Sequence, residues 1–380
     1  MIIAIISDVF YPHIGGVEKR FYELSKRLSN NHIIHVFTMQ IGNTKKFEKI
    51  DNIFIHRFHR INNLYKKGHR KILPSIIFSV KLLFKLLFKK FDLIECNSTP
   101  YFPCFVAKFI SLLKRAPLSI TFHEAWGNYW YDYLGIAGIF GRIIELLVGK
   151  LSKNIIAVSE FTKKELIRKI RINPKNIQVI PNGINCSLIN QINIEKDYDK
   201  ITYVGRLNPE KNVDLLIKAF YLINKKFQNK KLYIVGDGPE FKKLKNLSEN
   251  LGLINKVKFL RSFKLSDDVL KFIKSCGIFI MPSQREGQSI VCLESMASLT
   301  PVITINSKEN ALTNIIKDGH TGLITAPTPE LICDCALRIF NDQELYEKIQ
   351  KSSYSYAINF DWNNISKKLD QYYYKIKFSL

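Results

Sequence analysis

The strongest constraint on the fold is a regular alternation of short apolar runs with helical patterns, which covers nearly the whole chain. Apolar strands that alternate with helices are typical of a parallel sheet covered by helices on both faces. In the first half, strands are predicted at residues 2–8, 33–39, 53–58, 93–96, 118–122 and 155–158. The first half is therefore predicted to be an α/β domain.

The alternation stops near residues 179–183 and starts again after a polar run that ends at Lys200. In the second half, strands are predicted at 201–204, 232–235, 257–260, 278–281 and 301–305, and helices at 213–224, 240–250, 267–275 and 288–297. We therefore predict two doubly wound, Rossmann-like domains, residues 1–182 and 183–362, that face a cleft. In such sheets ligands bind beyond the carboxyl ends of the strands.

Charge and cysteine content narrow the class of protein less than the fold pattern does. The 57 Lys and Arg against 33 Asp and Glu give a net charge of +24, which attracts nucleic acid, anionic membranes or phosphorylated substrates. A Lys-rich compositional habit explains the charge equally well. The seven cysteines are odd in number and lie mostly in apolar runs, which indicates reduced, buried thiols and a cytosolic protein.

Membrane insertion and export are not expected from the sequence. The first ten residues, MIIAIISDVF, contain no basic region and are predicted to form a strand rather than a signal peptide. No apolar run approaches the roughly 20 residues that a membrane span needs.

The pairs His32 with His35 and His56 with His59 are each three residues apart, so on strands their rings would point to opposite faces. No metal site is therefore predicted.

Two carboxylates in the second half are spaced for an elongated ligand. Glu286 precedes a short apolar helix and Glu294 lies inside it, eight residues later. If most of that interval is helical, the two are separated by roughly 12 Å, which is too far for a shared proton. The helix N-terminus between them offers backbone N–H groups to an anion. The spacing predicts a clamp for a phosphate-bridged molecule.

Two glycine-containing loops precede this pair. Gly205, Arg206 and Lys211 belong to a loop after the first strand of the second domain, and both cations can reach a diphosphate from there. The alternative is two solvated loop cations. Residues 236–240, with Gly238, are predicted mainly to form a turn, with Asp237 capping the following helix and ligand contact a secondary role.

The first domain offers weaker candidates. Gly15 and Gly16, between the first strand and the first helix, would let a phosphate approach the backbone, although a simple tight turn explains them as well. They do not match the dinucleotide pattern G-x-G-x-x-G. His123 follows a predicted strand and could bind a sugar hydroxyl or transfer a proton. Taken alone, a structural histidine is the simpler interpretation.

Residues 75–90 form a largely apolar helical pattern with Lys81, Lys85 and Lys89 every four residues. No acidic residue occurs between Asp51 and Asp92, whereas ten Lys or Arg do. Such a helix is either a crossover helix whose lysines extend to solvent or a helix that lies on a membrane surface. The sequence leaves both interpretations open.

The G-R-x-x-x-x-K loop, the G-D-G-P turn and E-x7-E occur in an order that resembles glycosyltransferase family 4, retaining enzymes of the GT-B fold. The resemblance extends from the YPHIGGVE loop to the segment 360–362. It implies an acceptor-side N-terminal domain, a C-terminal domain that binds a nucleotide sugar, and a final helix, about 363–380, that crosses back onto the first domain.

The resemblance also implies roles for single residues. Arg206 and Lys211 would hold the donor diphosphate and stabilise the leaving nucleoside diphosphate. Glu286 would face the donor sugar and Glu294 the ribose, and backbone N–H groups near Gln288, Ser289 and Ile290 would bind the phosphates. Gly15 and Gly16 would approach the diphosphate from the other domain, and His123 would line the sugar and acceptor side. No metal or other cofactor is expected.

The chain departs from the family pattern at its candidate donor site. Where relatives usually read E-G-F-G, this chain has Gln288 and Ser289 after Glu286 and Gly287. Leu299 replaces a small glycine, and residues 308–314 replace a glycine-rich loop. These changes bear on which donor is used more than on whether the chain is active.

The sequence thus predicts a metal-independent glycosyltransferase that moves a hexose or N-acetylhexosamine from a nucleotide diphosphate sugar to a lipid-linked glycan or another cell-envelope or polysaccharide acceptor. It would be cytoplasmic and peripheral at the inner face of the cell membrane, with an anionic membrane surface as partner and no nucleic acid. The alternatives are a nucleotide-sugar epimerase of the same fold and a non-catalytic polyanion-binding protein.

Overall fold

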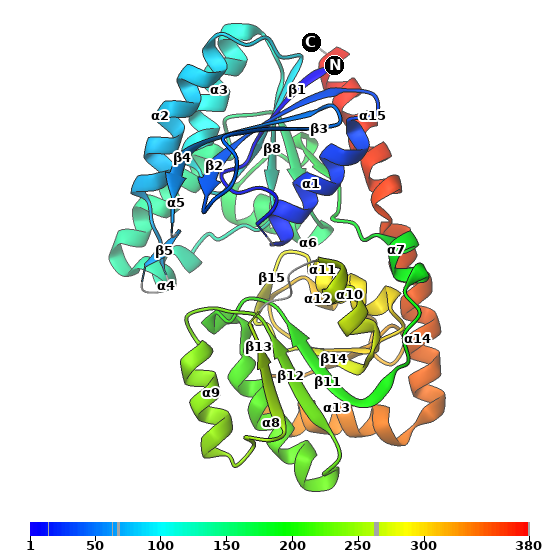
Figure 1. Cartoon of the computed structure of the whole chain (residues 1–380). Coiled ribbons are helices and arrows are strands. Elements are labelled where there is room, and N and C mark those ends of the chain that lie inside the picture. The colour runs from blue at the N-terminus through cyan, green and yellow to red at the C-terminus, as the bar shows by residue number, and fades with distance from the viewer. Residues whose placement is uncertain (14, 63, 67–68, 262–265, 379–380) are drawn as a thin grey trace. The chain divides into compact units, whose positions relative to one another are not determined.

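A computed structural model describes residues 1–13, 15–62, 64–66, 69–261 and 266–378 (Figure 1). Ile14, in the loop that supports the family resemblance, lies outside these residues. The chain divides into two compact units, one of residues 1–182 with 362–380 and the other of residues 183–361. Both units are doubly wound α/β structures, which confirms the predicted fold class.

The first unit is built on an eight-stranded sheet in the order β10-β9-β8-β7-β1-β2-β4-β3. Its neighbouring strands are parallel except β3 and β4, which are antiparallel. The strands of this unit, including the separate β5–β6 pair, are β1 Ile2–Ile6, β2 Ile33–Ile41, β3 Phe47–Ile50, β4 Ile53–Ile61, β5 Tyr65–Lys66, β6 His69–Arg70, β7 Leu93–Asn97, β8 Leu118–Phe122, β9 Asn154–Ala157 and β10 Ile177–Val179.

Helices cover both faces of this sheet because its parallel strands need crossover connections. The helices are α1 Gly16–Leu28, α2 Leu73–Leu87, α3 Phe102–Lys114, α4 Tyr129–Leu134, α5 Gly138–Val148, α6 Glu160–Glu165 and α15 Trp362–Phe378. Helices α2 and α3 lie side by side, and their buried residues pack against the sheet in one apolar core (Figure 1). The last helix, α15, packs against α1, and Arg27 Nε of α1 donates a hydrogen bond of 2.9 Å to Asn363 Oδ1.

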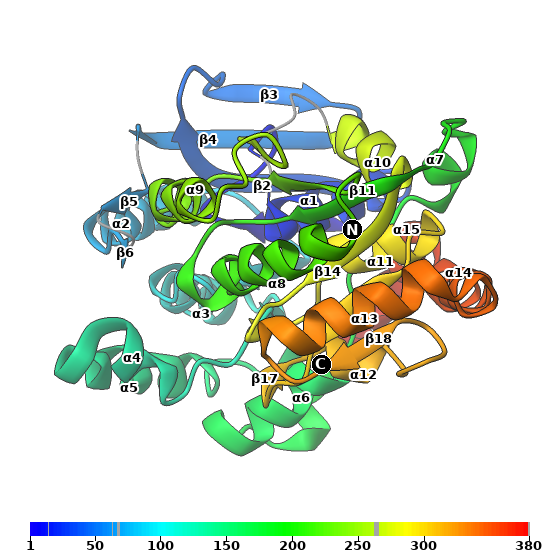
Figure 2. The same ribbon diagram turned by 90° about the horizontal axis from the view of Figure 1, so that it is seen from below.

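The second unit has a six-stranded parallel sheet in the order β13-β12-β11-β14-β16-β18. Its strands, including the separate β15–β17 pair, are β11 Asp197–Val204, β12 Lys231–Val235, β13 Val257–Leu260, β14 Cys276–Met281, β15 Arg285–Glu286, β16 Val302–Ile305, β17 Glu309–Asn310 and β18 Leu323–Thr325. Its helices are α7 Cys186–Gln191, α8 Val213–Lys226, α9 Phe241–Asn250, α10 Ser266–Lys274, α11 Ile290–Ala297, α12 Leu312–Ile315, α13 Pro329–Asn341 and α14 Gln343–Ala357. Helices α8 and α13 lie side by side (Figure 2), and α11 packs against α10 and α14.

Three local predictions were wrong. The helix at the candidate donor site begins at Ile290 and not at Gln288, so only the second half of the Glu286–Glu294 interval is helical and the estimate of roughly 12 Å loses its basis. Asp237 does not cap α9: its carboxylate accepts the N–H of the adjacent Gly238. Helix α2 ends at Leu87, so Lys89 lies beyond it.

Candidate functional site

The charged centre of the second unit is an ion pair between Lys211 and Glu286. Lys211 Nζ lies 2.7 Å from Glu286 Oε1 and 3.3 Å from the carbonyl oxygen of Arg285. The two side chains are only 16% and 11% exposed. Lys211 ends a short 3₁₀ turn, Pro209–Lys211, directly before α8, whereas Glu286 ends β15. The fold thus joins two predicted site residues that are 75 positions apart in sequence.

The segment that carries Glu286 is held by residues of the loop 308–314. Strand β15 pairs in parallel with β17, with Glu286 opposite Asn310, and the N–H of Ala311 donates to the carbonyl oxygen of Glu286. Asn310 is fully buried, and its amide group donates to the carbonyl oxygens of Ser283 and Ile305. The substituted loop therefore determines where the Glu286 backbone lies.

Tyr203, in the strand before it, holds the loop from Gly205 to Lys211 in place. The buried phenol of Tyr203 donates a 2.9 Å hydrogen bond to the carbonyl oxygen of Arg206. A Cβ on Gly205 would lie 2.7 Å from the phenol oxygen, so a side chain there would be in close contact with Tyr203. Burial and the nearby carboxylate of Glu286 raise the pKa of Tyr203 well above its ordinary value, so the phenol stays neutral and donates. The side chain of Arg206 is exposed.

Gly238 has a packing role in the neighbouring turn. A Cβ at this position would lie within 2.7 Å of backbone atoms of Leu207, and the N–H of Leu207 donates to the carbonyl oxygen of Asp237. The backbones of the two loops therefore touch, which only glycine permits here. This finding agrees with the prediction that residues 236–240 mainly form a turn.

Ser289 caps α11. Its hydroxyl accepts the N–H of Cys292 at 3.3 Å, and its backbone is extended, as at an ordinary N-cap. Ile290 and Glu294 are buried, with Glu294 only 2% exposed, and Gln288 is half-buried. The serine that replaces a family glycine thus satisfies a helix N–H and places a hydroxyl at the helix N-terminus.

In the first unit, Gly15 and Gly16 lie at the N-terminus of α1 as predicted, but a carboxylate lies over the turn. A Cβ on Gly15 would overlap the carboxylate of Glu18, which also lies 3.6 Å from Nδ1 of His13. A carboxylate is favourable at the positive end of a helix.

His123 follows β8 and packs its ring edge-on against Phe21 of α1, with ring centroids 6.2 Å apart. Within the described part of the chain its Nε2 is enclosed and has no hydrogen-bond partner. Burial, together with the charge of Arg20, lowers the pKa of His123 to about 3, so the imidazole is neutral. A neutral imidazole can donate a hydrogen bond to a sugar hydroxyl or accept one from it.

Within the part of the chain that the structure describes, the other histidines and the cysteines form no metal centre. His35 of β2 and His56 of β4 stack across the sheet with Nδ1 and Nε2 3.0 Å apart, a pairing that spacing along one strand does not reveal. Among the described residues no group of three His, Cys, Asp or Glu side chains could hold a metal ion. All seven cysteines are unpaired, and all but Cys186 are buried.

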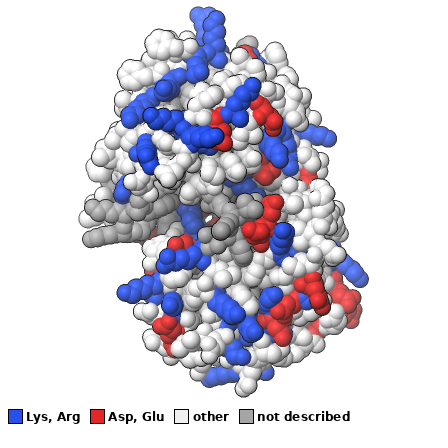
Figure 3. Space-filling model, in the orientation of Figure 1, with Lys and Arg blue, Asp and Glu red and all other residues white. Residues whose placement is uncertain are grey.

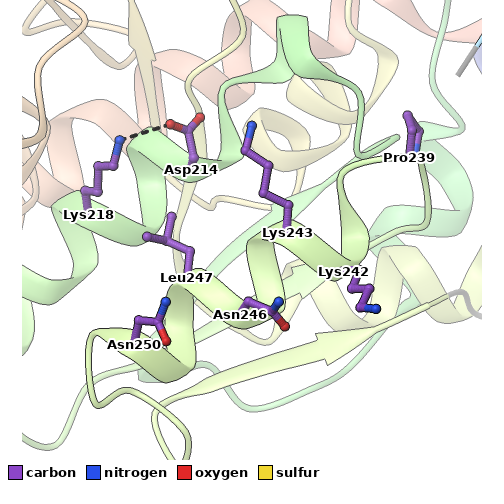
Figure 4. Close-up of a pocket in the computed structure, with 8 residues that line it drawn as sticks. All are labelled: Asp214, Lys218, Pro239, Lys242, Lys243, Asn246, Leu247 and Asn250. Atoms are coloured by element: carbon purple, nitrogen blue, oxygen red, sulfur yellow. Dashed lines mark hydrogen bonds and ion pairs between the residues drawn. The ribbon is translucent and has the colours of Figure 1, made fainter.

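A shallow pocket of about 630 Å³ lies between α8 and α9 (Figure 4). None of the predicted site residues lines it. Lys218 in this pocket is 3.2 Å from Asp214, and Lys243 is 2.7 Å from Glu240. These ammonium groups already have carboxylate partners, so the pocket is not the predicted donor site.

The sequence did not identify two buried charged residues of the first unit, of which Arg20 lies near His123. Arg20 of α1 and Glu95 of β7 are 0% and 1% exposed. Glu95 was visible as an acid inside an apolar strand, and Arg20 lies on the buried face of a helix. Asn310 was also not identified as a site-forming residue, because a two-residue strand has no sequence pattern of its own.

Two family models match the chain in succession. The model described as Glycosyltransferase Family 4 matches residues 14–188, and that described as Glycosyl transferases group 1 matches residues 187–356. The chain belongs to glycosyltransferase family 4. Among curated relatives, this transferase is 27% identical to an uncharacterized glycosyltransferase of Methanocaldococcus jannaschii, over 94% of both chains. It is 24% identical to alpha-monoglucosyldiacylglycerol synthase of Streptococcus pneumoniae, over 85% of this chain and 75% of the relative.

Solved structures show the same fold. The transferase matches sucrose-phosphate synthase from Thermosynechococcus elongatus with a TM-score of 0.82 and 19% identity over the whole of both chains. It matches HepE from Anabaena, solved in complex with UDP and glucose, with a TM-score of 0.76 and 17% identity over 97% of this chain and 98% of the other. This family 4 glycosyltransferase therefore has the GT-B fold.

Proposed function

We propose that this transferase moves a hexose or N-acetylhexosamine from a nucleotide diphosphate sugar to a glycan or lipid-linked acceptor, with retention of anomeric configuration. The observation that carries the proposal is the enclosed Lys211–Glu286 pair beside the capped N-terminus of α11. The HepE structure, which has the same fold, holds UDP and glucose.

Each residue has a distinct task in this proposal. Lys211 and the exposed Arg206 bind the diphosphate and stabilise the charge that develops on the leaving nucleoside diphosphate. Glu286 orients Lys211 through the ion pair and faces the donor sugar. The N-terminus of α11, at Ser289 and Ile290, binds phosphate oxygens through backbone N–H groups.

The remaining predicted residues complete this assignment. Glu294 binds the ribose, and Gln288 lies where donors are distinguished. Gly15 and Gly16 contact the diphosphate after Glu18 moves away, and neutral His123 accepts a hydrogen bond from a sugar hydroxyl. The acceptor hydroxyl attacks the face from which the phosphate departs, and the departing phosphate oxygen takes its proton. We propose that Arg206 and Lys211 stabilise the charge on the leaving diphosphate without a metal ion.

The first unit presents an apolar and basic face that suits a membrane surface. Helix α2 is a crossover helix whose inner side chains Phe78, Leu82 and Leu86 are buried, but Phe84 and Phe88 are 62% and 92% exposed. The neighbouring α3 adds exposed Phe109, Leu112 and Leu113, and Ile136 and Phe140 are exposed at and before α5. Such exposed aromatic and aliphatic side chains are typical of an interaction surface.

The charges on α2 and α3 have one sign. Helices α2 and α3 contain lysines and no acidic residue, and Lys and Arg side chains lie among uncharged surface over α2 (Figure 3). Among the described residues, no helix is long and apolar enough to cross a membrane. We propose peripheral attachment to an anionic membrane at the cytoplasmic side and an acceptor carried by a lipid. The relative named alpha-monoglucosyldiacylglycerol synthase supports a glycolipid product.

A thermal-shift screen of nucleotide sugars tests the donor class. A nucleotide sugar that binds the native state at 100 times its Kd stabilises it by about 2.7 kcal/mol and raises the unfolding midpoint. We expect at least one nucleoside diphosphate sugar to do so and the corresponding free sugar not to. Product analysis without acceptor then separates transfer from epimerisation. A converted nucleotide sugar, rather than an unchanged or hydrolysed one, would contradict transferase activity.

A further inference from the structure

Arg20 is a completely buried cation that connects α1 to the end of the long segment, residues 1–182, of the first unit. It lies about one helical turn beyond Gly16. Its Nη1 donates to the carbonyl oxygen of Pro181 at 2.7 Å and to Asn182 Oδ1 at 3.1 Å. The side chain of Arg20 therefore connects the helix that follows Gly15 and Gly16 to two residues that lie 161 and 162 positions after Arg20 in the sequence.

Pro181 and Asn182 stand where the chain passes from one unit to the other. The first unit ends at Asn182 and resumes at Trp362. In the second unit, the outgoing and returning segments are hydrogen-bonded, from the N–H of Ile184 to the carbonyl oxygen of Phe360 at 2.8 Å and from the N–H of Cys186 to Asp361 Oδ2 at 3.1 Å. We call residues 181–186 with 358–362 the crossover.

The hydrogen bonding of Arg20 is incomplete. Within the described residues, its Nε and Nη2 are buried without an acceptor, although a buried guanidinium normally engages most of its donors. The counter-charge is Glu95 of β7, whose Oε1 accepts the hydroxyl of Thr121 at 2.7 Å and whose Oε2 is buried without a partner. Arg20 thus keeps unused donors and Glu95 an unused acceptor, so the hydrogen bonds from Arg20 to Pro181 and Asn182 are not its only possible arrangement.

We propose that Arg20 is a positioning residue that transmits occupation of the turn at Gly15 and Gly16 to the crossover. An anion at this turn displaces the Glu18 carboxylate and shifts the first turn of α1. The shift weakens or strengthens the hydrogen bonds from Arg20 to Pro181 and Asn182, while Glu95, which shares no hydrogen bond with Arg20, supplies only the opposite charge. The inference rests on the proposed function, because it needs a nucleoside diphosphate as the ligand.

Hydrogen exchange on the full chain, with uridine diphosphate as the probe, tests this link. In the wild type we expect uridine diphosphate to slow amide exchange in the crossover at least 3-fold. Arg20→Lys keeps the charge but loses the planar set of donors, so we expect it to bind uridine diphosphate while losing that slowing. Arg60→Lys, in the same unit but hydrogen-bonded to Asn43 and not to the crossover, is the matched control and should keep it.

The outcomes separate this inference from the proposed function. If Arg20→Lys shows the same ligand-dependent slowing as the wild type, the link is wrong, although the donor class stands. If Arg20→Lys fails to fold, Glu95→Gln replaces it, since losing the counter-charge should also remove the slowing. If uridine diphosphate neither raises the unfolding midpoint of the wild type nor slows exchange, and other nucleoside diphosphates behave alike, the proposed donor class fails together with the inference.

Discussion

At the scale of single residues, the ion pair between Lys211 and Glu286 makes function and stability interdependent. Removing one partner leaves the other charge 11% to 16% exposed and without its counter-ion. We expect Lys211→Met to lower transfer about 100-fold or more, because the leaving diphosphate loses a cation, and to lower the free energy of unfolding by roughly 1–3 kcal/mol. Urea denaturation and turnover measure the two effects.

The double variant Lys211→Met with Glu286→Gln is the control for this prediction. It removes both charges, so stability should recover while transfer stays low. Turnover at the wild-type rate in Lys211→Met would remove this residue from the site.

His123 should make the stability of the first unit sensitive to acid. Burial and then the charge of Arg20 lower its pKa from 6.5 to about 3 in the folded chain. Between these values the unfolded chain binds a proton at His123 that the folded chain does not, so the contribution of His123 to the free energy of unfolding falls as the pH falls below 6.5, by about 2 kcal/mol at pH 5. His123→Asn should reduce this loss in urea denaturation at pH 7 and pH 5. An unchanged loss would mean that other groups cause it.

At the scale of elements, Ser289 is explained by capping as well as by any contact with a ligand. Replacing an N-cap serine by alanine costs about 1 kcal/mol, and by glycine only a few tenths. We therefore expect Ser289→Ala to lower the free energy of unfolding by about 1 kcal/mol and Ser289→Gly, the family residue, to lower it much less. Equal losses in urea denaturation would show that the hydroxyl does not stabilise the helix through its cap.

The elements also show what the sequence could predict. Long apolar strands such as β7 and β8 were found because burial on both faces leaves a clear pattern. The strands β15 and β17 were not found, because two residues with charged and polar side chains have no periodicity and pair only through the tertiary fold. Because this pairing arises only in the tertiary fold, the predictions named Glu286 and Lys211 without pairing them and omitted Asn310. Arg20 and Glu95 were omitted because a sequence pattern alone does not show that a charged side chain is buried.

At the scale of the whole molecule, we propose that the exposed apolar side chains on α2, α3 and α5 act together with the net charge of +24 in binding an anionic membrane. Burying one exposed Phe or Leu side chain contributes about 1.5–3 kcal/mol. We therefore expect Phe88→Ser with Leu112→Ser to weaken binding to anionic vesicles at least 10-fold in sedimentation. Ile254→Ser, at an exposed isoleucine of the second unit, is the control and should have no effect. Absence of lipid-dependent pelleting of the wild type at physiological salt would contradict membrane attachment.

The central claim is that the enclosed Lys211–Glu286 pair belongs to the donor site of a retaining sugar transferase. Proton NMR of a reaction that contains the donor found by thermal shift and a membrane lipid extract tests it most directly. The account predicts release of nucleoside diphosphate and a new glycosidic linkage with the anomeric configuration of the donor, both lost in Lys211→Met. A linkage of inverted configuration, or the same product from Lys211→Met at the wild-type rate, would contradict it.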